Sequence, residues 1–241
     1  MKRFLEVCVD DAFGLEQAIA GGADRIELCS ALSVGGLTPT PGLMALAAEQ
    51  PVPVYAIIRP RSGDFIYSES EIRTMLADID QVRACGLAGV VLGASRTDGR
   101  LDTDLLARLI AHSEGLGLTL HRAFDLVPDF SEAIEEAVRL GFERILTSGG
   151  APNVTDGLEN LRQIIDLAAG RISIMPGGGV SADNIDMLLE HLDVTDIHSS
   201  GSRPIGEIAE RILSLGFDTP ARRITDKANV ARIRAALSAK S

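Results

Sequence analysis

The sequence predicts an α/β fold in which eight parallel strands, each followed by a helix, close into a barrel. Eight short apolar runs alternate with longer stretches of helical period, they recur about every 27 residues, and helix-capping residues mark the boundaries. The chain has 241 residues, close to the length of about 250 that such a barrel takes. We therefore expect one domain, 1–241, with a (β/α)₈ TIM barrel over about 4–215 and an additional C-terminal helix over about 226–238.

The predicted strands are short apolar runs, and their spacing is that of a βαβ unit rather than of a hairpin. They lie near Phe4–Val9, Arg25–Leu28, Val54–Ile58, Gly89–Leu92, Leu118–His121, Arg144–Leu146, Ile172–Met175 and Thr195–His198. An open doubly wound sheet is the competing topology. The sequence argues against it because the first turn after a strand lacks the Gly-x-Gly-x-x-Gly pattern of a dinucleotide site.

Capping signals predict where the helices begin and end. Thr40 before Pro41 is an N-cap followed by a proline at the first helical position. The residues Ser68–Glu71 are typical of a capping box, and Ser181 can cap the seventh helix. Helix C-caps are expected at glycines that stand a few residues before a strand, namely Gly21, Gly22, Gly86, Gly117, Gly141 and Gly170.

The end of the chain predicts one more amphipathic helix. After Asp226, apolar residues at Val230, Ile233 and Leu237 have helical spacing, with basic residues between them. This helix packs either against the barrel or against a second subunit. A homodimer is the expected oligomer, because two-fold symmetric dimers are the commonest assemblies.

Composition and charge exclude several classes of protein. Asp and Glu number 34 against 23 Lys and Arg, a formal net charge of −11, so the surface should repel nucleic acid and anionic membranes. No apolar run approaches the roughly 20 residues of a membrane span, and Glu6 follows Lys2 and Arg3 too closely for a signal peptide. Three cysteines are too few and too odd in number for a disulfide framework, which indicates the reducing cytoplasm.

Two neighbouring strands end in the same Glu-x-Cys pattern. Glu6 and Cys8 belong to the first strand, and Glu27 and Cys29 to the end of the second. Because side chains alternate along a strand, each glutamate shares a face with its cysteine. On the inward face, two carboxylates and two thiols would converge on the floor of a pocket. The alternative is an internal layer in which the cysteines are small, buried hydrophobic residues.

Cationic and titratable side chains follow two further strands. Pro60 holds Arg59 extended, so Arg59 and Arg61 should project the same way and form a rigid two-guanidinium edge suited to a carboxylate or phosphate. After the fifth strand, His121 and Asp125 are candidate acid/base groups. In a barrel, chemistry takes place where the strands end, so these residues favour a site there.

The loops after the seventh and eighth strands carry an expected anion site. Glycine amides and a helix N-terminus in these loops form the usual phosphate site of a barrel. A tight turn is the competing interpretation of the glycines. We favour an anion or substrate site, in which the glycines act together with side chains at other strand ends. Its residues are Arg59, Arg61, Arg122, Ser148, Gly177, Gly178, Gly179, His198, Ser199 and Ser200.

Seven ordered motifs run from about residue 4 to residue 201. They are Glu6–Cys8, Gly22–Cys29, Gly35–Pro39, Ile58–Arg61 with Gly63–Phe65, His121–Asp125, Leu146–Gly149 and His198–Ser200. Together they resemble the CutC copper homeostasis family. The resemblance implies a cytoplasmic (β/α)₈ barrel assigned to copper homeostasis, with copper bound through Cys8 and Cys29. Two thiolates suit Cu(I), since soft ligands select this ion and a reducing cell supplies it.

Two functions follow from these observations. The first is a protein of copper homeostasis that binds Cu(I) at the barrel mouth. The second is an enzyme, an isomerase, lyase or hydrolase, whose small phosphorylated or carboxylated metabolite is held by the Arg/Gly/Ser cluster. Its candidate catalytic residues are Glu6, Glu27, His121 and Asp125. With two Tyr and no Trp, the composition gives little support to a protein-interaction scaffold.

Overall fold

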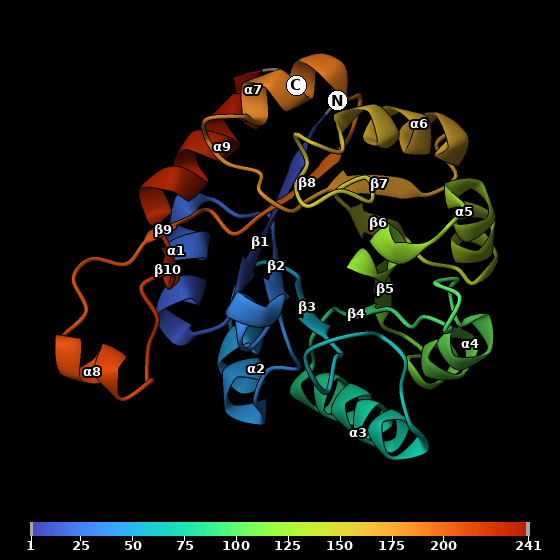
Figure 1. Ribbon diagram of the computed structural model, residues 1–241, viewed down its shortest axis with the longest axis horizontal. Coiled ribbons are helices and arrows are strands. Elements are labelled where there is room, and N and C mark those ends of the chain that lie inside the picture. The colour runs from blue at the N-terminus through green and yellow to red at the C-terminus, as the bar shows by residue number, and fades with distance from the viewer. Residues whose placement is uncertain (1, 240–241) are drawn as a thin grey trace.

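The computed structural model describes residues 2–239 and shows a barrel of parallel strands with helices packed around its outside (Figure 1). The strand order is β7-β6-β5-β4-β3-β2-β1-β8, in which every neighbour is also a neighbour in the chain except at the return from β8 to β1. The predicted (β/α)₈ barrel is therefore confirmed, and each predicted strand end is correct within one residue. The strands are β1 (Phe4–Val9), β2 (Arg25–Leu28), β3 (Val54–Ile57), β4 (Gly89–Leu92), β5 (Gly117–Leu120), β6 (Arg144–Thr147), β7 (Ser173–Pro176) and β8 (Asp196–Ser199).

Helices follow the strands along the chain, and two single turns of 3₁₀ helix cover Leu32–Val34 and Arg122–Leu126. Among residues 2–239, no helix is long and apolar enough to cross a membrane. The α-helices are α1 (Ala12–Gly21), α2 (Pro41–Ala48), α3 (Glu69–Cys85), α4 (Thr103–His112), α5 (Phe130–Arg139), α6 (Leu158–Ala168), α7 (Ile185–His191), α8 (Glu210–Ser214) and α9 (Lys227–Ala239).

Most of the capping predictions agree with the helix ends. The Thr40 side chain accepts a hydrogen bond from the first turn of α2, and the capping box at Ser68 begins α3. The expected cap at Ser181 is wrong: its hydroxyl accepts from a backbone N–H two residues later, and α7 begins after Asn184. Gly117 is not a helix C-cap either, because it is the first residue of β5.

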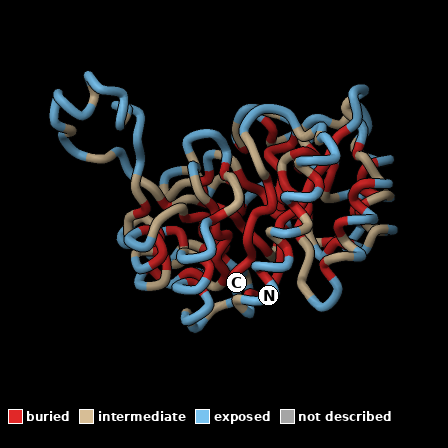
Figure 2. Tube along the Cα trace, turned by 90° about the horizontal axis from the view of Figure 1, so that it is seen from below, coloured by how far each residue is buried: buried red, intermediate tan, exposed pale blue. Residues whose placement is uncertain are grey.

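The barrel wall separates an apolar layer from a polar interior. Side chains that point outward from β1, namely Leu5, Val7 and Val9, are fully buried in the core that residues of the helices share. Buried residues lie along the interior of the barrel region, and exposed ones lie mainly at its periphery (Figure 2). Side chains that point inward alternate with the outward ones and include Glu6 and Cys8 of the same strand. Since all the strands are parallel, the inward-facing residues near their carboxyl ends meet at one mouth of the barrel.

The register between strands decides which of the inward-facing residues meet. Glu6 of β1 lies opposite Arg25 of β2, and Cys8 lies opposite Glu27. On the other side of β1, Glu6 lies opposite His198 of β8. The two Glu-x-Cys patterns are thus offset by two residues, and the thiol of β1 is level with the carboxylate of β2 rather than with its thiol.

Residues between β8 and α9 form an arm that was not predicted from the sequence. Its base is an antiparallel hairpin of β9 (Ser202–Pro204) and β10 (Arg223–Thr225), and the short α8 lies at its far end, away from the barrel (Figures 1 and 2). The predicted C-terminal helix is present as α9. It packs between α7 and α1, where the eighth helix of a barrel lies.

The substitution Leu237→Ala is expected to lower the free energy of unfolding by about 2–5 kcal/mol, because it leaves a cavity beneath α9. Leu237 is completely buried on the barrel side of this helix. Urea-induced unfolding measures the change. The exposed neighbour Ser238 provides the control, and Ser238→Ala should change the free energy by less than about 0.5 kcal/mol. Equal effects of the two substitutions would show that α9 adds nothing to the core.

Candidate functional site

A cavity of about 860 Å³ opens at the carboxyl ends of the barrel strands. The arm closes one side of it with residues 216–219 and 221–225, which the sequence gave no reason to expect there. Most of the residues predicted for the site line this cavity, namely Cys8, Glu27, Arg59, His121, Arg122, Gly178, Gly179, His198, Ser199 and Ser200. The predicted residues outside the lining are Glu6, Cys29, Arg61, Asp125, Ser148 and Gly177.

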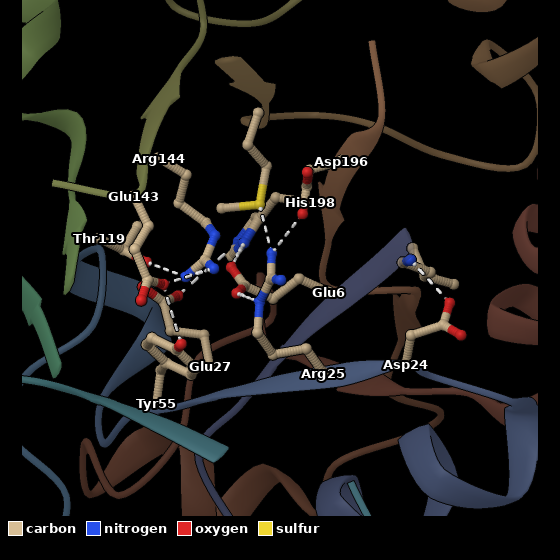
Figure 3. A network of polar contacts seen from close by, with 12 residues as sticks. Glu6, Asp24, Arg25, Glu27, Tyr55, Thr119, Glu143, Arg144, Asp196 and His198 are labelled. Atoms are coloured by element: carbon tan, nitrogen blue, oxygen red, sulfur yellow. Dashed lines mark hydrogen bonds and ion pairs between the residues drawn. The ribbon is translucent and has the colours of Figure 1, made fainter. Parts of the chain in front are cut away.

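Beneath the cavity, the barrel interior holds a network of buried charges (Figure 3). The Arg25 guanidinium lies 2.5 Å from a carboxylate oxygen of Glu6 and 2.8 Å from one of Asp196. All three residues are buried, so each charge depends on the others for compensation. Burial alone would raise the pKa of Glu6, but Arg25 and His198 lower it to about 2. Glu6 is therefore an anion at neutral pH in the floor of the site.

Glu6 also orients the imidazole of His198. The Nδ1 nitrogen donates a hydrogen bond of 2.8 Å to Glu6 Oε1. The other ring nitrogen, Nε2, lies 3.7 Å from a carboxylate oxygen of Glu27. Burial would lower the pKa of His198, but the neighbouring Cys8, Glu6 and Glu27 raise it well above its usual value. The ring is thus anchored at one nitrogen and presents the other to the residues that line the cavity.

Cys8, Glu27 and His198 place a sulfur, a carboxylate oxygen and an imidazole nitrogen within 4.8 Å of one another. The three residues come from β1, β2 and β8, and all are buried. Cys8 keeps 7% of its surface exposed, on the side of the cavity. Donor atoms this close together can share one small ion. The cluster is therefore a candidate metal site, and it opens to the cavity.

Cys29 lies beside this cluster without reaching the cavity. Its Sγ donates a weak hydrogen bond to Glu27 Oε2 at 3.6 Å, and its side chain is fully buried. Gly36 covers it so closely that a Cβ added there would lie 3.1 Å from the sulfur. Burial and the charge of Glu27 raise the pKa of the Cys29 thiol well above its ordinary value. Cys29 is thus a protonated donor that helps to position Glu27, and its role as a metal ligand stays a prediction.

Arg59 and His121 line the cavity with hydrogen-bond donors. Two nitrogens of the Arg59 guanidinium donate to three backbone carbonyls in the loops around β3. The Nδ1 of His121 accepts a hydrogen bond of 3.1 Å from a backbone N–H, so its proton resides on Nε2. Burial, helped by the charge of Arg59, lowers the pKa of His121 to about 3. This ring is therefore neutral at pH 7 and better suited to donate a hydrogen bond than to act as a base.

Arg61 lies outside the cavity, so the expected two-guanidinium edge is not formed. Its guanidinium contacts Asp64 of the same loop at 2.8 Å and Glu71 in the first turn of α3 at 2.5 Å. The physical reason is local, because two carboxylates within ten residues of Arg61 compete for it more effectively than a distant ligand. Arg59, two residues earlier in the chain, lies in the wall of the cavity.

Asp125 and Ser148 accept hydrogen bonds from the Arg122 guanidinium and fix its position. Arg122 Nε donates to Asp125 at 2.7 Å, and Nη2 donates to Ser148 Oγ at 2.6 Å. The Asp125 carboxylate also accepts from the hydroxyl of Thr147 and from the backbone N–H groups of Ser148 and Gly150. Asp125 is thus saturated by structural hydrogen bonds, which argues against the expected acid/base role. Its effect is to fix Arg122 as a cation in the cavity wall.

The glycine loop after β7 borders the cavity beside Arg122. Gly178 and Gly179 have φ values of 97° and 84°, which other residues rarely adopt. Gly177 lies beneath them, where an added Cβ would be 3.0 Å from His198. The hydroxyl of Ser199 is used within the fold, since it donates to a carbonyl in the same loop. The donors that face the cavity here are therefore backbone N–H groups of the loop and the guanidinium of Arg122 rather than the hydroxyl of Ser199.

Two charged residues of the network, Arg25 and Asp196, were not predicted as part of the site. A signal for them exists in the sequence, because Arg25 precedes Glu27 by two residues and Asp196 precedes His198 by two. Strict alternation along a strand would have placed both on the inward face. The arm gave no such signal, since its strands have only three residues each.

Comparisons with known proteins identify the family that the chain resembles. The profile of the CutC family matches residues 3–203. A family protein CutC of Rhizobium meliloti is 60% identical over 235 residues, which are 98% of this chain and 96% of the relative. The crystal structure of a CutC protein of Streptococcus agalactiae, which has a provisional assignment to copper homeostasis, matches with a TM-score of 0.78 and 32% identity. That match covers 82% of this chain and 98% of the other.

Barrels of other families share the fold alone. Phosphoribosylanthranilate isomerase of Thermotoga maritima matches with a TM-score of 0.59 and 14% identity, over 99% of this chain and 100% of the other. At this identity, the likeness carries no information about substrate or mechanism. The functional conclusion must therefore come from the residues of the cavity.

Proposed function

Because the chain belongs to the CutC family, we propose that it takes part in copper homeostasis by binding one Cu(I) ion as cargo at the mouth of its barrel. Cys8 and His198 are the principal ligands in this proposal, and Glu27 is a third donor beside the ion. Cys29, the second ligand implied by the resemblance, belongs to the same buried cluster as Cys8 and positions Glu27.

The strongest support is the carboxylate–histidine pair beneath the cavity. Glu6 accepts the Nδ1–H of His198, so Nε2 lies on the side of Cys8 and Glu27, where a bound ion would replace the proton that the raised pKa of the ring keeps on this nitrogen. Histidines that bind metals almost always donate their second nitrogen to such a carboxylate, which fixes the ring and raises its basicity.

The donor set favours a soft ion over a hard one. Thiolate sulfur selects Cu(I), and imidazole also suits copper. Zinc is the competing cation, because it accepts cysteine, histidine and glutamate ligands together. The partial exposure of Cys8 gives an ion a path to the cavity and from there to solvent.

We place this activity in the cytoplasm. Cys8, Cys29 and Cys85 are all free thiols. A reducing compartment keeps thiols in this state and supplies copper as Cu(I). The homodimer expected from the frequency of two-fold assemblies stays a prediction.

A second candidate function is an enzyme that acts on a small phosphorylated or carboxylated metabolite. The observation that favours it is the fixed Arg122 guanidinium beside Gly178 and Gly179, in the loop where barrel enzymes hold phosphate. Binding of copper alone does not require these groups. Glu27 is the remaining candidate for proton transfer in this role, since it lines the cavity and burial raises its pKa.

The reduced protein is expected to bind one equivalent of Cu(I) in competition with a chromophoric Cu(I) chelator. His198→Gln should weaken binding by at least about 100-fold, because the loss of an outer-shell partner alone costs 10–100-fold. His191→Gln is the matched control, since His191 lies exposed at the end of α7. Its affinity should equal that of the unmodified protein.

Three results would contradict the copper proposal. The first is binding in His198→Gln as tight as in the unmodified protein, and the second is no binding in either. The third is displacement of Cu(I) by an equal concentration of Zn²⁺, which would reassign the site to zinc.

A further inference from the structure

Two buried donors in the wall of the cavity have no partner. They are Nε of Arg59 and Nε2 of His121, whose residues are 5% and 3% exposed. Among the buried side-chain polar atoms of residues 2–239, only two others lack a hydrogen bond, in Tyr67 and Ser95, and neither residue lines the cavity. A buried donor without an acceptor destabilises the folded protein. Two of them beside one cavity indicate a ligand that brings acceptor atoms and reaches them when a side chain packed over them, such as Phe65, moves aside.

Arg59 also carries a buried charge without a counterion. Its Nη1 and Nη2 donate to carbonyl oxygens at 2.8–3.0 Å, and its guanidinium lies 5.0 Å from the centre of the Phe65 ring. Within residues 2–239, no carboxylate lies within ion-pair distance of it. Carbonyl groups and an aromatic ring orient the guanidinium but leave its charge uncompensated. Buried charges in proteins are normally paired, so this arginine calls for an anion.

His121 is held as a neutral donor next to this charge. The hydrogen bond from the Ala123 N–H to Nδ1 leaves the proton on Nε2. The ring lies 4.7 Å from the Phe65 ring, and Gly93 makes room for it, because a Cβ at Gly93 would lie 2.1 Å from the imidazole. Phe65 therefore contacts both Arg59 and His121, which keeps the two unpaired N–H groups in one region of the wall.

We propose that Arg59 and His121 bind the carboxylate group of a small metabolite in the cavity. Two N–H donors and one positive charge suit the two oxygens of a carboxylate. The site lies at the ends of β3 and β5, and the proposed copper ligands lie on β1, β2 and β8. The glycine loop at Gly178 follows another strand, β7, and lines the same cavity. Carboxylate binding thus goes beyond the copper function and does not depend on it.

The test uses the full-length, copper-free protein and sodium acetate, with sodium chloride at equal ionic strength as the reference. Acetate should shift the His121 Nε2–H signal in NMR spectra in a saturable manner, because it accepts the hydrogen bond of that group. Pyruvate and malonate carry the same group and should produce the same shift. Acetate should also raise the unfolding temperature more than chloride does.

Two variants remove the donors in different ways. His121→Phe keeps an aromatic ring against Phe65 and should weaken acetate binding at least about 10-fold, as measured by the unfolding temperature. Arg59→Lys keeps the charge but lacks the Nε–H, and it should also weaken binding. Arg108→Gln, which removes one charge from the exposed face of α4, is the matched control and should respond as the unmodified protein does.

The inference is overturned if none of the three acids gives a saturable shift, or if both variants bind acetate as tightly as the control. Loss of acetate binding in only one variant supports the site and shows which donor dominates. A failure of the copper proposal is distinguishable, since it concerns Cu(I) titrations that share no reagent with this experiment.

Discussion

Cys8→Ser is expected to raise the dissociation constant for Cu(I) by at least about 1000-fold, which corresponds to about 4 kcal/mol. Cys8 supplies the only soft donor that both lines the cavity and lies within 4.8 Å of His198 and Glu27 among residues 2–239. Serine offers a hard oxygen that stays protonated at neutral pH, and Cu(I) selects thiolate. Competition with a Cu(I) chelator, under full reduction, measures the change.

Cys29→Ser and Cys85→Ser are the controls for this substitution. Cys29 is buried behind Gly36 and donates to Glu27, so its loss should cost no more than the 10–100-fold of an outer-shell partner. Cys85 ends α3 and should have no effect. Equal losses in Cys8→Ser and Cys29→Ser would instead support the two-cysteine site implied by the resemblance. An unchanged affinity in Cys8→Ser would refute both arrangements.

Arg25→Ala is expected to lower the free energy of unfolding by about 3–5 kcal/mol at pH 7, because it leaves the buried carboxylates of Glu6 and Asp196 without their cation. Urea-induced unfolding measures the loss. Arg25→Met, which keeps most of the volume, separates the charge from the packing and should lose nearly as much. Arg171→Ala removes an exposed ion pair with Glu135 and should cost less than about 1 kcal/mol.

Acid should reduce the difference between the unmodified protein and Arg25→Ala. The pKa of Glu6 is about 2 in the folded protein, against an ordinary value of 4.5. A lowered folded-state pKa stabilises the protein above pH 4.5, and this stabilisation disappears as the pH falls from about 4.5 to 2. Arg25→Ala has already lost most of it, so the two proteins should differ most at pH 7 and less at pH 3. A difference that is the same at both pH values would contradict the account of the network.

The barrel could be predicted because its boundaries depend on local signals. The run Phe4–Val9 reads as a strand from its own residues, and the capping box at Ser68 marks the start of α3 without reference to the rest of the chain. The same holds for α9, whose buried positions Val230, Ile233 and Leu237 follow helical spacing. Signals of this kind survive folding because tertiary packing reinforces them.

The pairing of site residues could not be predicted, because register between strands is a tertiary property. The repeated Glu-x-Cys pattern suggested that Cys8 and Cys29 lie at the same depth, but Cys8 pairs with Glu27. This offset of two residues changes which donors are neighbours. Of the two cysteines, Cys8 lines the cavity and Cys29 does not. His198 was predicted as an anion-binding residue for a related reason, since its carboxylate partner is 192 residues away in the sequence.

Arg61 illustrates a different limit. The direction of a long side chain depends on the charges nearest to it, which the residues around Pro60 alone do not decide. Glu71 lies in the first turn of α3 and Asp64 in the same loop, and together they fix the guanidinium at the surface. Predictions from strand ends are therefore more reliable for buried residues such as Arg59 than for exposed ones.

The position of the bound ion tests the central claim most directly. Crystals of the reduced protein loaded with one equivalent of Cu(I) should give a single anomalous difference peak at the copper edge, bounded by Cys8 Sγ and His198 Nε2 with Glu27 beside it. A peak on Cys29 and remote from His198, or no peak at the barrel mouth in protein that retains its copper, would contradict the assignment of this site.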